Sequence, residues 1–121
     1  MNHSKHINIP IYPVTILVCV SDDPVAERKQ LSDKLGAYHG PDKFHGCAVE
    51  HKGKFGLFID RKSLTNEVIA HEVYHLTQMI MKYLGAQIDN EPAAYLAGWL
   101  TQEVYGLCNK WRERISNKKL I

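Results

Sequence analysis

The sequence has little excess of charge of either sign. Fifteen Lys and Arg residues stand against thirteen Asp and Glu residues, so the formal net charge is +2 over 121 residues. Because a surface that neutralises nucleic-acid phosphates normally needs a clear excess of basic residues, we expect no nucleic-acid partner. The apolar fraction of 45% is ordinary for a folded protein. We therefore expect one globular domain that spans residues 1–121.

Cysteine pairs and long apolar runs are also missing. The three cysteines, Cys19, Cys47 and Cys108, contain no CxxC pair, which argues against a disulfide framework and against a cysteine-based zinc site. Free thiols are typical of a reducing compartment, so we expect a cytoplasmic protein. No apolar run reaches about 20 residues, the length that a bilayer span needs, and Pro10 and Pro13 interrupt the most apolar N-terminal stretch. We expect no membrane association.

Hydrophobic periodicity, turn residues and helix caps predict six elements in the order β-α-β-β-α-α. They are a strand at 11–20, a helix at 24–35, two strands at 47–50 and 54–59, a helix capped by Ser63 or Thr65 that runs to 84, and a helix from Asn90 to about 115. The segment His51-Lys52-Gly53 predicts a tight hairpin turn between the two paired strands. The expected fold is α+β, with a small sheet of about three strands and one helix packed on the two last helices.

The residues His71, Glu72 and His75 form an HExxH motif within the helix predicted at 63–84. Four residues separate the histidines, so both imidazoles project from one helix face about one turn apart and can hold one Zn²⁺. Glu72 leans toward the same side, where it can take a proton from a zinc-bound water whose pKa the metal has lowered to about 7. The motif therefore predicts a zinc site with Glu72 as the general base.

The residues around the motif are uncharged and mostly bulky: Val68, Ile69, Val73, Tyr74 and Leu76. They predict a helix that is buried nearly all round, in which unpaired polar groups would be costly. A bound metal would account for all three ionisable side chains at once. The alternative is that both histidines are satisfied core residues and that the glutamate reaches the surface.

A catalytic zinc usually has three protein ligands, so a third ligand is required. Glu91 is the first candidate, because it opens the last predicted helix and shares a face with Ala94 and Gly98, whose small side chains allow close helix packing. The motif helix is predicted to run about nine residues past His75, so Glu91 reaches the histidines only with a steep crossing angle or an early helix end. Glu103, three turns later on an apolar stripe, is the alternative ligand. Without a metal role, Glu91 would stabilise the helix dipole.

The segment 68–76 resembles the extended zincin consensus around HExxH. Asn90-Glu91 followed by Ala94 is similar to the glutamate helix of the gluzincins, the zincin branch whose third ligand is a glutamate on the following helix. The predicted order of elements also resembles the gluzincin core over about residues 11–108, in outline.

The resemblance implies a minimal zincin core and a Zn²⁺-dependent peptidase that acts on a peptide or protein substrate. It implies that zinc is held by His71, His75 and Glu91 and that Glu72 activates the water. In this family the strand before the motif helix borders the cleft and binds the substrate in extended form, which corresponds here to residues 54–60.

Two departures from the larger gluzincins bear on activity. Tyr95 stands where these relatives often carry an acid that orients a zinc-bound histidine, and no second subdomain follows the glutamate helix. The chain is similar to the minimal stand-alone gluzincins, whose peptidase activity is often restrained. The alternative function is therefore a zinc-containing binding or regulatory module with little turnover, and a metal-free interaction domain is the third possibility.

A peptidase site usually adds a donor for the oxyanion of the tetrahedral intermediate. Tyr95, Tyr105 or a histidine outside the motif could supply it, and the sequence does not choose between them. These histidines lie in predicted loops, where a solvated side chain is the ordinary state: His3, His6, His39, His45 and His51.

Overall fold

The computed structural model describes residues 3–10, 12–35, 45–85 and 91–119, with side chains except at 30–35, 51, 91 and 114–119. The elements are β1 (His3–Asn8), β2 (Thr15–Ser21), α1 (Pro24–Leu35), β3 (Gly46–His51), β4 (Lys54–Asp60), the 3-10 turn η1 (Arg61–Ser63), α2 (Asn66–Tyr83) and α3 (Glu91–Lys119). Among the described residues, no helix combines the length and the apolar character that a membrane span requires.

Strands β1 to β4 form one mixed sheet in the order β1-β2-β4-β3. β1 and β2 are antiparallel, β2 and β4 run parallel, and β3 returns antiparallel to β4. The two central strands read TILVCVS and KFGLFID. Their aliphatic and aromatic residues form continuous apolar runs, as expected for strands covered on both faces.

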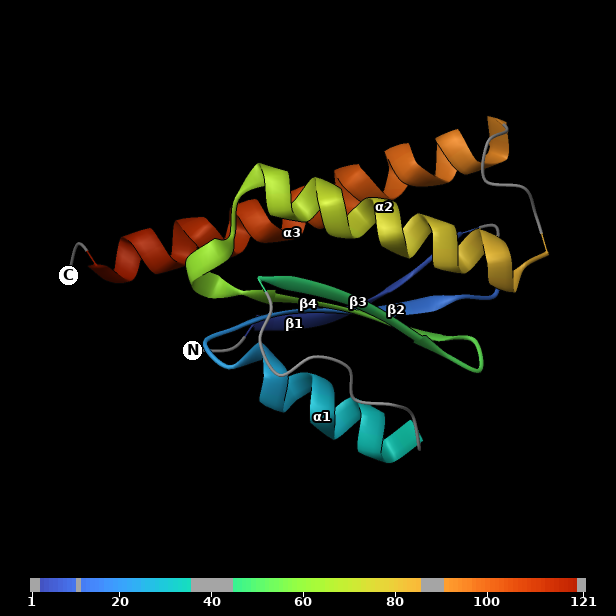
Figure 1. Cartoon of the computed structure of the whole chain (residues 1–121). Helices are drawn as coiled ribbons and strands as arrows, with labels where there is room; N and C mark the ends of the chain where they lie inside the picture. Colours follow the sequence, from blue (N-terminus) through green and yellow to red (C-terminus); the bar gives the residue numbers. More distant parts are fainter. Residues whose placement is uncertain (1–2, 11, 36–44, 86–90, 120–121) are drawn as a thin grey trace.

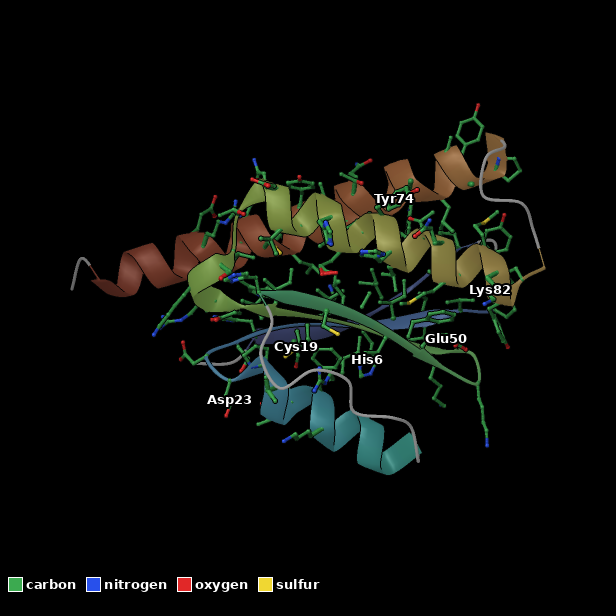
Figure 2. All side chains as sticks on the ribbon, viewed as in Figure 1. His6, Cys19, Asp23, Glu50, Tyr74 and Lys82 are labelled. Carbon is green, nitrogen blue, oxygen red and sulfur yellow. The ribbon has the colours of Figure 1, made fainter. Side chains whose placement is uncertain are left out.

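The sheet lies between two layers of helices (Figure 1), with α2 and α3 on one face and α1 on the other. The main core is on the α2 and α3 side, where Ile16, Val18 and Val20 of β2 are fully buried together with apolar residues of both helices. Because side chains alternate along a strand, Cys19 points to the opposite face, toward α1 (Figure 2). The motif helix α2 therefore rests on a rigid sheet.

The predicted α+β class is confirmed, but the described residues form a sheet of four strands where about three were predicted. The additional strand is β1, which the sequence did not reveal because four of its six side chains are exposed and only Ile7 is buried. Its pairing with β2, with Ile7 opposite Ile16, satisfies the backbone groups of β1 that face β2. A polar edge strand of this kind has no clear apolar alternation to predict it.

The local signals for the hairpin turn and for both ends of the motif helix are confirmed. Lys52 and Gly53 join β3 to β4 with φ angles of 51° and 83°, the left-handed pair of a tight hairpin turn. Thr65 caps α2, and its hydroxyl oxygen accepts a hydrogen bond from the backbone N–H of Val68 at 3.2 Å. Gly85 follows the end of α2 with a φ of 73°, as expected for a glycine after a helix.

α3 runs to Lys119, about one turn beyond the predicted end near 115. Its second half packs on the rest of the fold: Trp111 is buried and stacks on His3 with ring centroids 5.5 Å apart. The hydroxyl of Tyr105 donates a hydrogen bond to the backbone carbonyl of Asn66 at 2.8 Å. α3 is thus attached both to β1 and to the first turn of the motif helix.

Candidate metal centre

The HExxH residues lie on the middle turns of α2. His71 and His75 are one turn apart, and their Nε2 atoms are separated by 3.1 Å. Their ring planes meet at 73°, with centroids 4.7 Å apart. The prediction that both imidazoles share one face of the helix is confirmed, and the two nitrogens converge on one point.

The motif helix is amphipathic, so the prediction that it is buried nearly all round is wrong. Ile69, Leu76 and Ile80 are fully buried in the core, whereas His71 is exposed and Tyr74 is 61% exposed. Figure 2 shows Tyr74 on the side of α2 that is turned away from the sheet. The sequence misleads here because an aromatic residue occupies the solvent-facing side.

Glu72 is the buried member of the motif, with 5% of its surface exposed. Gly46, the first residue of β3, packs directly on it, since a Cβ atom at position 46 would lie 2.7 Å from Cγ of Glu72. Burial raises the pKa of the Glu72 carboxyl, and His71 and His75 act in the opposite direction. The alternative interpretation, with buried histidines and a glutamate at the surface, is therefore wrong.

The donor set fits a divalent metal ion. His71, Glu72 and His75 each offer one ligand atom, and these atoms all lie within 4.8 Å of one another. Two imidazole nitrogens that bind one tetrahedral Zn²⁺ at roughly 2.0–2.1 Å lie about 3.3 Å apart, which is close to the observed 3.1 Å. Imidazole also suits copper, iron and nickel. The geometry supports a metal site without identifying the metal.

The two glutamates considered as a third ligand both belong to α3. Glu91 is its first residue, and the side chain of Glu91 lies outside the described residues. α2 continues from His75 to Tyr83, a distance of about 12 Å along the axis that a ligand from the start of α3 has to span. Glu103 is half-buried and does not join the cluster of possible ligand atoms within the described part of the chain. Glu91 stays the predicted third ligand.

A cavity of about 280 Å³ adjoins the motif and is lined by His45, Gly46, Glu67, Val68, His71 and Glu72. His45 directly precedes β3, and its Nδ1 atom lies 2.7 Å from the hydroxyl oxygen of Ser63 in η1. No motif or spacing distinguishes His45 from the other histidines outside the motif in the sequence. The prediction that these histidines lie in loops is wrong for His3 and His6, which belong to β1, and for His51, which ends β3. Only the pairing of β3 with β4, which is followed by η1 and α2, brings His45 to the motif.

β3, and not the predicted segment 54–60, is the edge strand beside the motif helix. β4 (Lys54–Asp60) pairs with β2 on one side and with β3 on the other, so the segment expected to bind the substrate is an inner strand of the sheet. Within the described residues, β3 pairs only with β4, and its first residue touches Glu72. The hairpin connection explains this arrangement, because it places the later of its two strands inside the sheet.

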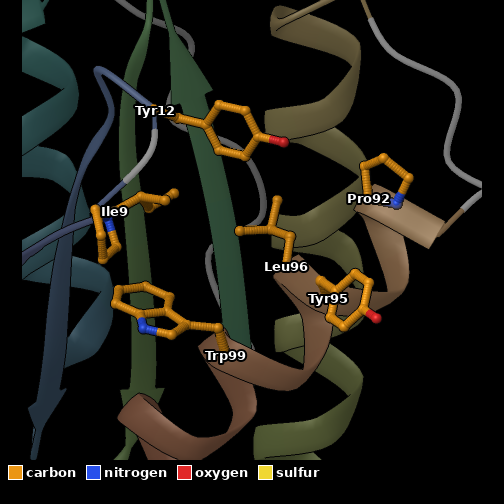
Figure 3. A pocket seen from close by; sticks show the side chains of 7 residues that line it. Ile9, Tyr12, Pro92, Tyr95, Leu96 and Trp99 are labelled. Atoms are coloured by element: carbon orange, nitrogen blue, oxygen red, sulfur yellow. The ribbon is translucent and has the colours of Figure 1, made fainter.

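A larger and almost wholly apolar cavity of about 510 Å³ lies apart from the HExxH residues. Its lining residues are Ile9, Pro10, Tyr12, Pro92, Tyr95, Leu96 and Trp99. Figure 3 shows them between the chain that follows β1 and the first turns of α3. Tyr95 lines this second cavity and is 75% exposed, so the structure does not bring it to the candidate metal centre.

No family model, curated protein or solved structure matches this chain. Fold and site together define an α+β protein with a candidate divalent-metal centre on an HExxH helix. Any functional assignment therefore depends on the chemistry of the site itself.

Proposed function

We propose that this protein is a zinc-dependent peptidase of the gluzincin type, built on a minimal zincin core. The observation that carries the proposal is the placement of a buried carboxylate, Glu72, beside two imidazole nitrogens 3.1 Å apart and next to a cavity. Hydrolysis by an activated water needs this combination of a metal-binding pair, an adjacent base and room for a substrate. The substrate would be a peptide or protein.

His71 and His75 would hold the zinc ion through their Nε2 atoms, and Glu91 is the proposed third ligand. When bound, zinc polarises a carbonyl group and lowers the pKa of a water molecule. Glu72 is proposed to act as a base and not as a ligand, because its carboxyl group is buried under Gly46 on the β3 side of α2.

In this proposal Glu72 takes a proton from the attacking water while the water oxygen bonds to the scissile carbonyl carbon. The C–N bond then breaks, and Glu72 passes the proton to the departing amine nitrogen. Burial supports this role, because it raises the pKa of the carboxyl and makes the carboxylate a stronger base than a solvated glutamate.

The outer edge of β3 is the proposed binding surface for the peptide backbone. An extended peptide can add to an edge strand through main-chain hydrogen bonds. β3 supports this mode, because it pairs only with β4 in the described part of the chain and begins at the residue that packs on Glu72.

The first test is metal content. We expect about one Zn²⁺ per chain in protein purified under zinc-replete conditions, measured by elemental mass spectrometry. His71→Ala and His75→Ala should each lose the metal, because each removes one of two converging nitrogens. His6→Ala, which changes an exposed histidine on β1, should keep it. Wild-type protein without metal would overturn the proposal.

The second test is turnover. Glu72→Gln should keep zinc and the fold but lower cleavage of a peptide library at pH 7 by about 10² to 10⁴, the usual contribution of a general base. If the zinc-loaded wild type does not cleave peptides, the peptidase proposal fails. The alternative function, a zinc-containing binding or regulatory module, then becomes the better account. Equal cleavage by wild type and Glu72→Gln would show that Glu72 is not the base or that the activity is a contaminant.

A further inference from the structure

His45 is a histidine outside the HExxH motif that lines the cavity beside His71 and Glu72. It is exposed, so its ring is accessible to a ligand in the cavity. Its backbone is fixed at the sheet, because the carbonyl of His45 accepts a hydrogen bond from the N–H of Asp60 at 2.9 Å. A side chain on a fixed backbone can hold a defined position without being buried.

Ser63 restricts the imidazole of His45. The distance between Nδ1 and the Ser63 hydroxyl oxygen is 2.7 Å, so this ring nitrogen is engaged and Nε2 is the ring nitrogen left for a ligand. A neutral imidazole carries one proton. If the hydroxyl donates to Nδ1, that proton must be on Nε2, which then becomes a hydrogen-bond donor.

The other candidate donors are placed elsewhere. The hydroxyl of Tyr105 already donates to the carbonyl of Asn66 at 2.8 Å. Tyr95 lines the apolar cavity at the start of α3. Of the three kinds of donor that the sequence left open, the structure brings only a loop histidine to the cavity beside the motif.

The charges around the cavity favour a donor. Two of its lining side chains are the carboxyl groups of Glu67 and Glu72. When Glu72 has taken the proton of the water, Glu67 still repels the negative charge that develops on a carbonyl oxygen in this cavity. A preorganised N–H group offsets that repulsion. The hydrogen bond that it donates is stronger in the transition state than in the ground state.

We propose that His45, oriented by Ser63, donates a hydrogen bond from Nε2 to the scissile carbonyl oxygen of the peptide and to the oxyanion that forms from it. The inference rests on the proposed peptidase function. His45 is the residue that contacts the substrate, and Ser63 is a positioning residue that keeps the ring in the tautomer with its proton on Nε2. No proton leaves His45 in this role.

The experiment compares His45→Ala, His45→Gln and Ser63→Ala with wild type, each as the zinc-loaded full chain with confirmed metal content and thermal stability. We expect His45→Ala to lower kcat by about 10²-fold and to leave KM within about threefold, as for the loss of one oxyanion donor. His45→Gln retains an N–H donor of similar reach, so its kcat should be about tenfold higher than that of His45→Ala. Ser63→Ala should lower kcat by about tenfold, because the ring loses its orientation.

Binding gives a second measurement that does not depend on turnover. The probe is a phosphinic peptide, in which a tetrahedral phosphinate replaces the scissile amide, titrated by calorimetry. We expect His45→Ala to weaken the binding of the phosphinic peptide about 10²-fold. The same substitution should weaken the binding of an unmodified product peptide by less than about threefold. His6→Ala, an exposed histidine beside a different cavity, is the matched control and should change neither value.

The outcomes separate this inference from the proposed function. Wild type that holds zinc and cleaves peptides, with His45→Ala equally active, overturns the role of His45 and leaves the peptidase intact. Loss of zinc in His45→Ala would make His45 a metal ligand and would also overturn the inference. If His45→Ala fails to fold, His45→Gln and Ser63→Ala decide, because both keep a polar side chain at position 45. Zinc-loaded wild type that neither cleaves peptides nor binds the phosphinic peptide refutes both proposals.

Discussion

At the scale of single residues, the burial of Glu72 depends on the close packing of Gly46. The absence of a side chain at Gly46 lets β3 approach α2 closely enough to exclude water from the Glu72 carboxyl. Burial raises the pKa of that carboxyl, so the same contact that packs the strand also tunes the proposed base. A glycine at this position thus has a chemical consequence as well as a steric one.

Gly46→Ala tests this contact. Its Cβ atom would lie 2.7 Å from Cγ of Glu72 and 3.1 Å from Cγ1 of Val68, so either the strand or the glutamate must move. We expect a loss of about 1–3 kcal/mol in the free energy of unfolding, as for an overpacked site. We also expect about 10²-fold lower turnover, because a displaced base is misaligned. Denaturant titration and the cleavage assay measure the two effects.

Gly98→Ala is the control for this substitution. Gly98 is an exposed residue inside α3, and a Cβ atom there would meet nothing within 4 Å. We expect it to stabilise the protein by about 0.5–1 kcal/mol through helix propensity and to leave turnover unchanged. Turnover that is unaffected in Gly46→Ala would contradict the close packing of β3 on Glu72.

The third metal ligand is tested at Glu91 and Glu103. Because removal of a ligating carboxylate weakens a zinc site strongly, we expect Glu91→Gln to lower the zinc affinity about tenfold or more and Glu103→Gln to leave it unchanged. Competition with a chromophoric chelator measures both affinities. The reverse ranking would transfer the role to Glu103, and two unchanged affinities would exclude both glutamates of α3 as ligands.

At the scale of elements, α3 stabilises the start of the motif helix. Arg112 donates hydrogen bonds to the backbone carbonyl of Leu64 at 2.7 Å and to the side chain of Asn66 at 3.4 Å. Tyr105 donates to the backbone carbonyl of Asn66. These contacts hold the chain that enters α2, directly before Glu67 and Val68, which line the cavity. The second half of α3 therefore helps to position the candidate site.

We expect Arg112→Ala to lower the free energy of unfolding by about 1–3 kcal/mol, because it removes charge-assisted hydrogen bonds to a half-buried carbonyl. Lys110→Ala, at an exposed position on the same helix, should change it by less than about 0.5 kcal/mol. Urea denaturation followed by circular dichroism measures both variants. Equal stabilities for Arg112→Ala and wild type would show that α3 does not hold the start of α2 in solution.

At the scale of the whole molecule, the sheet separates two environments. One face carries the main core and the HExxH helix, and the other faces α1. Cys19 lies on the α1 side (Figure 2), whereas Cys108 is buried in the core on the opposite side. Burial raises the pKa of Cys19 to about 12 and that of Cys108 to about 11. Both thiols are therefore protonated and shielded at neutral pH.

Thiol labelling probes this layered arrangement. Cys47 is half-buried on the edge strand β3, whereas Cys19 and Cys108 are at most 2% exposed. We expect N-ethylmaleimide at pH 7 to modify Cys47 first and the other two cysteines only in denaturant, because burial raises the pKa of all three thiols but leaves Cys47 partly accessible to the reagent. Intact-mass analysis with peptide mapping follows the order. Early labelling of Cys19 or Cys108 would contradict the packing of the corresponding layer.

Features that depend on neighbours a few residues apart could be predicted from the sequence. The spacing of His71 and His75 places both imidazoles on one helix face, and the structure confirms it. Thr65 caps the motif helix, and Lys52-Gly53 forms the hairpin turn. Helix periodicity, capping and turn geometry are local, so their residues carry the information directly.

Long-range contacts determine which strand lies at the edge, which motif residue is buried and which histidine outside the motif reaches the cavity. These features could therefore not be predicted from the sequence. β1 is too polar to be recognised without β2 as its partner. Glu72 is buried because Gly46 packs on it, and His45 reaches the motif because β3 pairs with β4. These contacts join segments distant along the chain, and the free energy that selects them comes from burial and pairing in the complete fold.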